Sequence, residues 1–124
     1  MDMERLVSIQ ATKFPLTDAI REYILKKVLS VEKLIHGFNE NARVFVEVGK
    51  TTSHHHKGEI FRAEIQIMPP RSKKGLRATA EETDIYKAMD KAKDEIKKEL
   101  VAFHGRNISR FRDGARRAKR LAFR

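Results

Sequence analysis

The sequence predicts an α+β fold: a βαβββα two-layer sandwich in which two helices pack on one face of a four-stranded mixed sheet. Four segments alternate apolar and polar residues with the period of a half-buried strand, and two longer segments repeat apolar residues every three or four positions, as amphipathic helices do. A strand, a helix and a second strand form a right-handed parallel crossover, whereas three strands joined by short loops form an antiparallel meander.

The first part of the chain predicts a strand followed by a long helix. Apolar and polar residues alternate over residues 5–11, which favours a strand with one buried face. Thr17 then has the position of an N-cap residue, and apolar residues recur at helical spacing from Ile20 to Ile35. Gly37 stands where a C′ glycine ends a helix, so we expect one continuous helix up to this glycine.

Three further strands are predicted in the middle of the chain, at residues 42–48, 59–68 and 76–80. The first is rich in β-branched residues, and the second alternates most regularly of all. A polar, glycine-bounded segment separates these two and is typical of a loop. Pro69 and Pro70 end the second strand, and a basic turn leads to the third.

A second amphipathic helix begins at Ile85 and completes the βαβββα order. Thr83 is its expected N-cap, and the helix dipole favours the carboxylate of Asp84 beside it. At about 100° per residue, its apolar stripe consists of Ile85, Met89, Ala92, Ile96 and Leu100. The lysines opposite the apolar stripes are Lys26 and Lys33 on the first helix and Lys87, Lys91 and Lys98 on the second. With both stripes on the sheet, we expect these lysines to form one outward basic surface.

Composition indicates a small basic domain with a still more basic tail. The 124 residues suffice for one domain, which we place at residues 1–104, and we expect residues 105–124 to be a disordered tail. The formal net charge is +10, and residues 106–124 contribute +7 because they hold eight basic residues and one Asp. These basic residues are Arg106, Arg110, Arg112, Arg116, Arg117, Lys119, Arg120 and Arg124. The chain has no cysteine, no apolar run near the roughly 18 residues of a membrane span and no signal-peptide order, so we expect a soluble cytoplasmic protein.

The excess of positive charge favours a nucleic-acid partner, because such charge attracts a polyanion. A membrane partner is not expected, since the tail lacks a broad apolar face. The helix lysines alone are also compatible with an ordinary solvated face, because Asp94, Glu95 and Glu99 interleave with them. The basic turn holds three more candidate contacts, which are equally compatible with a charged hairpin turn: Arg71, Lys73 and Lys74.

Neither a metal site nor a catalytic site is predicted, and we expect no cofactor and no small-molecule substrate. His54, His55 and His56 are consecutive in a polar loop, a spacing that does not arrange three imidazoles tetrahedrally. We interpret them as loop residues; a metal enzyme that used them would contain stoichiometric metal. Tyr86 lies beside the apolar stripe, which favours packing over stacking on a nucleobase.

Three stretches of the chain occur in the order and spacing of a known family: FPLTDAIREYILKKV, KGEIFRAEIQI and LRATAEETDIYKAMDKAKDEIKKEL. They resemble the ribosome hibernation promoting factor family, or sigma-54 modulation protein family, which includes the ribosome-associated inhibitor of translation. The resemblance covers residues 5–103. Its most specific parts are Asp84-Ile85-Tyr86 with Ala88 and Asp90, and the helix start Leu16-Thr17 with Ala19-Ile20-Arg21.

The resemblance implies a noncatalytic cytoplasmic protein that binds rRNA on the intersubunit side of the small ribosomal subunit, where mRNA and the A- and P-site tRNAs lie. Such a protein inhibits translation by steric occlusion in stress or stationary phase, protects idle ribosomes, and competes with tRNA, mRNA and initiation factors. The family's basic helix faces correspond here to Lys26, Lys27, Lys33, Lys87, Lys91 and Lys98.

Two features of this chain depart from parts of that family. Long members add a domain that pairs ribosomes, and this chain resembles a short form without it. Some short forms carry an acidic or mixed extension, whereas the tail here is basic, and we expect it to follow rRNA near the mRNA path. An adaptor or chaperone for double-stranded or structured RNA is the alternative interpretation, because it would need a similar basic surface.

Overall fold

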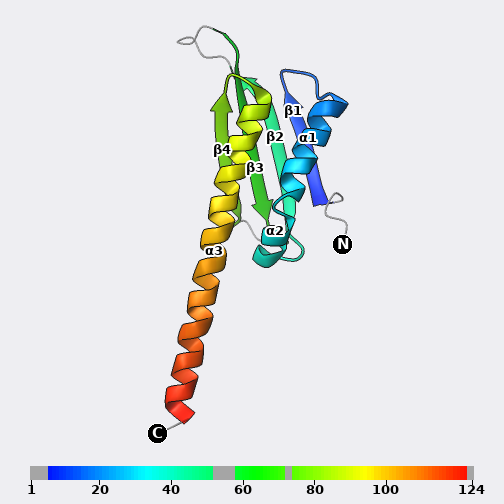
Figure 1. Cartoon of the computed structure of the whole chain (residues 1–124). Coiled ribbons are helices and arrows are strands. Elements are labelled where there is room, and N and C mark those ends of the chain that lie inside the picture. The colour runs from blue at the N-terminus through cyan, green and yellow to red at the C-terminus, as the bar shows by residue number, and fades with distance from the viewer. Residues whose placement is uncertain (1–5, 52–57, 72–73, 123–124) are drawn as a thin grey trace.

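Seven helices and strands follow one another along the chain in a computed structural model that describes residues 6–51, 58–71 and 74–122, with backbone alone from residue 107 onward. They are β1 (Val7–Thr12), α1 (Asp18–Leu29), α2 (Glu32–Phe38), β2 (Arg43–Thr51), β3 (Ile60–Met68), β4 (Leu76–Glu82) and α3 (Ile85–Ala122). Figure 1 shows the helices in front of the sheet, with the end of α3 extending far past it.

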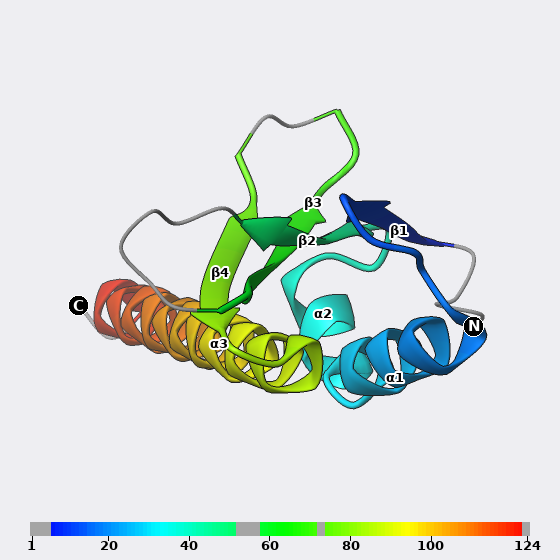
Figure 2. The same ribbon diagram turned by 90° about the horizontal axis from the view of Figure 1, so that it is seen from above.

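The four strands form one mixed sheet in the order β1-β2-β3-β4. β1 pairs with β2 in parallel, and β2–β3 and β3–β4 are antiparallel. All three helices lie on the same side of this sheet (Figure 2). The predicted two-layer sandwich is therefore confirmed, and every strand boundary lies within three residues of its expected position.

The core lies between the sheet and the helix layer. Inward side chains of β2 and β3, such as Val46 and Ile65, are at most 2% exposed, and the apolar stripes of α1 and α3 meet them. Ile24, Met89 and Ile96 are equally buried, as their spacing predicts. The helix faces away from this stripe are consequently left at the surface.

The first predicted helix is two helices, which corrects the expectation of one continuous helix ending at Gly37. The Ser30 hydroxyl donates to the Lys27 carbonyl at 2.6 Å, and the buried Val31 leaves helical geometry with φ −113° and ψ 16°. A serine hydroxyl that bonds the backbone in this way competes with the helical pattern. α2 then runs through Gly37 to Phe38, whose ring packs 4.8 Å from that of Phe103 on α3.

The start of α3 also differs from the expectation in one detail. The Asp84 carboxylate, rather than Thr83, is the cap: its Oδ1 accepts the Tyr86 N–H at 2.7 Å and the Lys87 N–H at 3.3 Å. By contrast, the expected Thr17 cap of α1 is present, with Oγ1 accepting the Ile20 N–H at 3.2 Å.

The backbone of residues 105–122 is helical and continuous with α3, which differs from the disordered tail that the sequence predicts. This segment consists mainly of Ala, Arg, Lys and other residues that tolerate a helix, and Gly114 interrupts them at a cost of about 1 kcal/mol. At 1.5 Å per residue, the 38-residue α3 is about 57 Å long. The domain boundary at residue 104 stays a prediction.

Candidate nucleic-acid interface

The outer surface of the helix layer brings together the basic residues of α1, α2 and α3. Tyr23 of α1 and Tyr86 of α3 make an edge-to-face contact with ring centroids 4.7 Å apart. Farther along α3, Phe38 of α2 contacts Phe103. The two aromatic contacts hold α1 and α2 against the same side of α3, so lysines that are far apart in the sequence share one layer.

The predicted helix lysines fall into two groups according to their ion pairs. Lys27 lies 3.2 Å from Asp90, Lys98 lies 3.3 Å from Glu95, and Lys91 pairs with Glu82. The second group is exposed and forms no ion pair with any part of the chain that the structure describes: Lys26, Lys33 and Lys87. An unpaired, solvated ammonium group can bind a phosphate without first leaving a carboxylate, so this second group is the better candidate.

Lys91 is turned away from α1, although it shares a predicted face with Lys87. Its partner Glu82 ends β4, the edge strand on the far side of α3 from α1, and the hydrogen bond from Lys91 lowers the pKa of Glu82. Lys97 was missed by the sequence prediction, because it lies about 80° around the helix from Lys87. It is exposed and has no ion pair within the described ranges.

A small polar cluster joins α1 to α3 at the centre of this surface. Asp90 Oδ1 accepts a hydrogen bond from the Tyr23 hydroxyl at 2.5 Å and also contacts the Lys27 ammonium. The hydrogen bond to Asp90, together with burial, raises the pKa of Tyr23 to about 12. Lys27 lies 5.2 Å from the centroid of the Tyr23 ring, within the range of a cation–π contact. Asp90 therefore restrains two residues of α1 from its position on α3.

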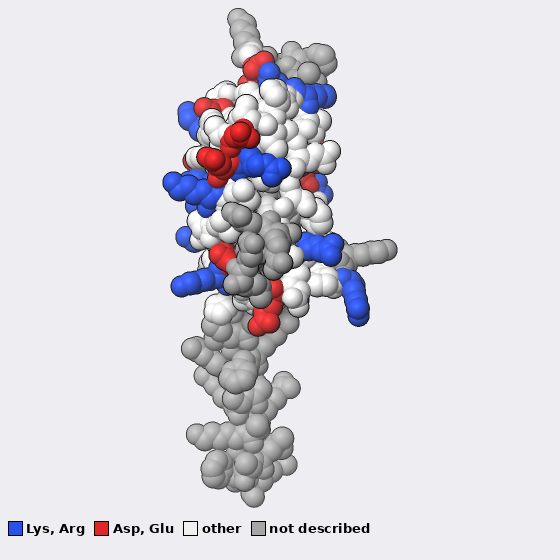
Figure 3. Space-filling model, turned by 90° about the vertical axis from the view of Figure 1, so that its right-hand side faces the viewer, with Lys and Arg blue, Asp and Glu red and all other residues white. Residues whose placement is uncertain are grey.

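The charge of the helix layer is mixed, and most of the positive charge lies farther along α3. Residues 18–38 and 85–104 hold nine Lys or Arg and seven Asp or Glu, a net charge of +2, against +7 for residues 106–124. Figure 3, which views the side of α1 and β1, shows basic groups projecting at both edges with acidic groups among them. The helix layer alone is consequently a weak electrostatic attractor.

The remaining predicted contacts lie in the turn between β3 and β4 and on the end of α3. Arg71 and Lys74 are exposed in the turn between β3 and β4, and Arg71 has a positive φ of 58°, which is uncommon outside glycine. Lys73 and the histidines His54, His55 and His56 lie outside the described residues. Arg106 is exposed on α3. The next six predicted contacts lie on helical backbone, with side chains that are not described: Arg110, Arg112, Arg116, Arg117, Lys119 and Arg120.

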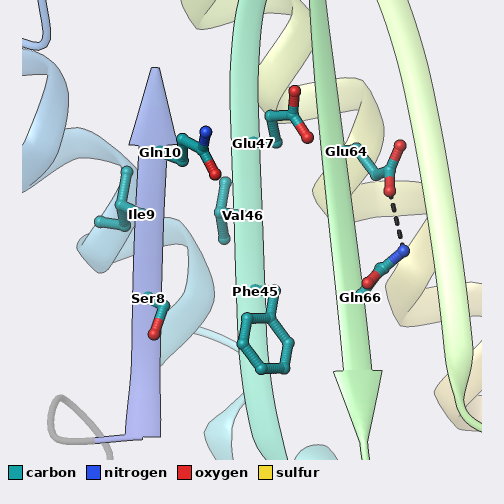
Figure 4. A pocket seen from close by; sticks show the side chains of 8 residues that line it. All are labelled: Ser8, Ile9, Gln10, Phe45, Val46, Glu47, Glu64 and Gln66. Carbon is teal, nitrogen blue, oxygen red and sulfur yellow. Dashed lines mark hydrogen bonds between the residues drawn. The ribbon is translucent and has the colours of Figure 1, made fainter. Parts of the chain in front are cut away.

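The opposite face of the sheet carries a second, different feature, an open pocket of about 510 Å³. Figure 4 shows Phe45, Glu47, Glu64 and Gln66 among its lining side chains, with Gln66 donating a hydrogen bond to Glu64 at 2.9 Å. Arg62 and Arg77 contact the same Glu64 carboxylate at 2.8 and 2.9 Å. Two carboxylates at its rim make this pocket a poor site for a phosphate backbone.

Polar residues of the sheet face bury the carboxylate of Glu64, which sequence periodicity does not predict. Glu64 is 7% exposed although it points away from the core, because its three partners cover it. Burial pushes the pKa of Glu64 up, but the hydrogen bonds from Arg77 and Arg62 outweigh it and hold this pKa below its ordinary value.

No group of three or more His, Asp or Glu that could hold a metal ion occurs within residues 6–51, 58–71 and 74–122.

Comparison with known proteins identifies the family to which the chain belongs. The model of the Sigma 54 modulation protein / S30EA ribosomal protein family matches residues 7–108, so the chain belongs to this family of ribosome-associated factors. The expected family is thereby confirmed. No curated protein sequence matched the chain.

Solved structures show the same fold. The Thermus thermophilus Protein Y N-terminal domain superposes with a TM-score of 0.56 at 24% identity, covering 78% of this chain and 97% of that one. A ribosomal subunit interface protein from Coxiella burnetii gives a TM-score of 0.53 at 16% identity, covering 80% and 97%. None of the helices in the described ranges has the length and apolarity of a membrane span.

Proposed function

We propose that the protein is a noncatalytic translation inhibitor that binds rRNA of the small ribosomal subunit in the channel for mRNA and the A- and P-site tRNAs. It acts in the cytoplasm by steric occlusion, competes with tRNA, mRNA and initiation factors, and protects idle ribosomes in stress or stationary phase. Family membership supports a ribosomal partner. The observation that carries the choice of rRNA is the placement of unpaired lysines on the helix layer, together with the net charge of +7 over residues 106–124.

Binding by this surface needs no reaction, only phosphate neutralisation and a fit to folded RNA. Each cation that meets a phosphate releases condensed counterions, so affinity depends steeply on salt. The unpaired cations Lys26, Lys33 and Lys87 contribute directly, whereas Lys27, Lys91 and Lys98 must exchange a carboxylate for a phosphate. The length of α3, about 57 Å at 1.5 Å per residue, lets one helix follow an RNA groove well beyond the sheet.

Sucrose-gradient sedimentation with purified ribosomes tests the proposal. The protein should sediment with small subunits and be displaced by tRNA or initiation factors. An adaptor for structured RNA would instead prefer free duplex RNA and would compete with the small subunit only weakly. Failure of the wild-type protein to sediment with small subunits at low salt would refute the proposed function.

Three matched triple variants then test the assignment of residues. The unpaired set is Lys26→Gln, Lys33→Gln and Lys87→Gln, the paired set is Lys27→Gln, Lys91→Gln and Lys98→Gln, and the control set is Lys13→Gln, Arg21→Gln and Arg43→Gln. Lys13 and Arg43 lie outside the helices, and Arg21 lies on the side of α1 away from α3, about 160° around α1 from Tyr23.

The unpaired set should weaken binding most and reduce the slope of log K against log salt by about 0.7 for each phosphate that is no longer neutralised. The paired set should have a smaller effect, since those lysines already have partners, and the control set should leave the slope unchanged. Equal losses of affinity in all three sets would show that binding depends on net charge alone. Circular dichroism verifies that each variant stays folded.

A further inference from the structure

Tyr86 projects from the first turn of α3 and is not part of the core. It is 38% exposed, whereas its neighbours Ile85, Ala88 and Met89 face the sheet at 8% exposure or less. The packing role that the sequence favours is therefore not against the sheet. The backbone at Tyr86 is held by the Asp84 cap, which accepts its N–H at 2.7 Å.

The Tyr86 ring is also held from the side by α1. Tyr23 lies edge-to-face with it, with an interplanar angle of 90° and centroids 4.7 Å apart. Tyr23 is itself restrained by its hydrogen bond to Asp90 and by Lys27, which lies near its ring. Tyr86 is thus an aromatic ring with little freedom left to lose on binding, and more than a third of the residue still faces solvent.

Unpaired cations lie near this ring on the solvent side, together with the carboxylates of Asp84 and Asp90. Lys87 follows Tyr86 directly, is exposed and has no ion pair with the described residues, and Lys26 is exposed on α1 in the same layer. A rigid, partly exposed aromatic ring next to unpaired cations is the combination with which proteins hold an unstacked nucleobase and its phosphates. Phe45, on the sheet face, is 41% exposed, but no aromatic contact holds its ring within the described residues, so it lacks the restraint that Tyr86 has.

We propose that Tyr86 stacks on an unpaired nucleobase of the bound RNA, with Lys87 at an adjoining phosphate and with Asp90 and Tyr23 as positioning residues. This inference rests on the proposed rRNA binding and adds to it a local requirement: the RNA must present a base outside a helix where α1 meets the start of α3. Lysines alone would bind the phosphates of a continuous duplex equally well.

Fluorescence tests the contact directly, because the chain has no tryptophan. Tyr86→Trp introduces a single probe at the proposed stacking position, and Phe45→Trp introduces a matched probe of similar exposure on the sheet face. On addition of small subunits, the indole at position 86 should be quenched by the stacked base, and the indole at position 45 should not. Quenching at neither position in a protein that sediments with small subunits would overturn the inference and leave the proposed function intact.

Affinity measurements supply the second readout. Tyr86→Leu should weaken small-subunit binding about ten- to a hundredfold, whereas Tyr86→Phe, which keeps the ring, should bind within about twofold of the wild type. The salt slope should not change in either variant, since no cation is removed. Wild-type affinity in Tyr86→Leu would overturn the inference. Absence of binding by the wild-type protein would overturn both the inference and the proposed function, so the two failures are distinguishable.

Discussion

The helix face and the outward face of the sheet are both rich in charge, but they differ in how many of their charged side chains are paired. The outward strand positions carry three Arg and three Glu, and Glu64 with Arg62 and Arg77 forms a network that satisfies its own members. On the helix face, Lys26, Lys33 and Lys87 form no ion pair within the described ranges. Charge that is satisfied internally stabilises the fold, and charge that is left over is available to a partner.

The two halves of α3 also differ in burial and in charge. Its first half buries Met89, Ile96 and Leu100 against the sheet and pairs several of its charges, whereas residues 105–122 continue past the sheet with seven basic residues and one Asp. We therefore expect the first half to determine orientation and the second half to supply most of the electrostatic attraction.

Removal of residues 106–124 should have the largest effect on binding. The truncated protein loses a net charge of +7 and should bind small subunits at least about a hundredfold more weakly at moderate salt. Its salt slope should fall by up to about 5, at about 0.7 for each of seven phosphates. Sedimentation at several salt concentrations measures both quantities. Unchanged affinity and slope would exclude contact between this segment and rRNA.

Glu64→Gln should destabilise the fold without affecting RNA binding, which would distinguish the role of the sheet face from that of the helix face. Arg62 and Arg77 lose a charged acceptor in a buried setting, so the free energy of unfolding should fall by about 1–3 kcal/mol. Glu81→Gln, at an exposed position on the same face, is the control and should stay within about 0.5 kcal/mol of the wild type. Urea unfolding measures the difference. A matching loss of small-subunit affinity in folded Glu64→Gln would place the sheet face in the interface.

The stabilisation from Glu64 should depend on pH with a defined sign. The pKa of this carboxyl lies below its ordinary value of 4.5 in the folded protein, so its contribution is present above pH 4.5 and is lost as pH falls through the folded value. The unfolding free energies of the wild type and Glu64→Gln should therefore converge in acid. A difference that stays constant down to the acid-unfolded range would contradict the assignment.

Asp90→Asn should have the smallest effect and should sharpen the description of the helix face. The release of Lys27 should raise small-subunit affinity, and the weaker restraint on Tyr23 and Tyr86 should lower it, so the net change should stay within a few-fold of the wild type. The substitution also replaces the charged acceptor that raises the pKa of Tyr23 to about 12 with a neutral amide oxygen, and this pKa should return toward 10.0.

Ultraviolet titration measures the Tyr23 pKa cleanly in a Tyr86→Phe background, because the chain has only two tyrosines. The raised pKa means that the Tyr23 contribution to stability is complete below pH 10.0 and is lost as pH rises through about 12. An unchanged Tyr23 titration in Asp90→Asn would show that the hydrogen bond does not form in solution.

Local patterns were sufficient for most of the fold. Alternation assigns Val44, Val46 and Val48 to the core and Phe45 to the surface, because successive strand side chains point to opposite faces whatever lies around them. The Thr17 cap follows equally from local chemistry. The break at Ser30 could not be predicted in this way, since the apolar spacing continues through it and the burial of Val31 depends on the sheet beneath.

The candidate site was predictable only in outline. Periodicity places Lys87 and Lys91 on one face of a helix, but the position of Glu82 decides that Lys91 is paired and that Lys87 is not. Likewise, Tyr23 and Asp90 are 67 residues apart in the chain, and only the packing of α1 on α3 brings them within hydrogen-bond distance.

The sequence by itself determined the order of elements, the faces they bury and the concentration of positive charge toward the C-terminal end, because these properties depend on residues close together in the chain. Tertiary structure decided which lysines remain unpaired, why Glu64 is buried and why Tyr86 is at the surface. The physical reason is that an ion pair or a stacked ring depends on distances of a few ångströms between different elements, and those distances are established only when the helices pack on the sheet.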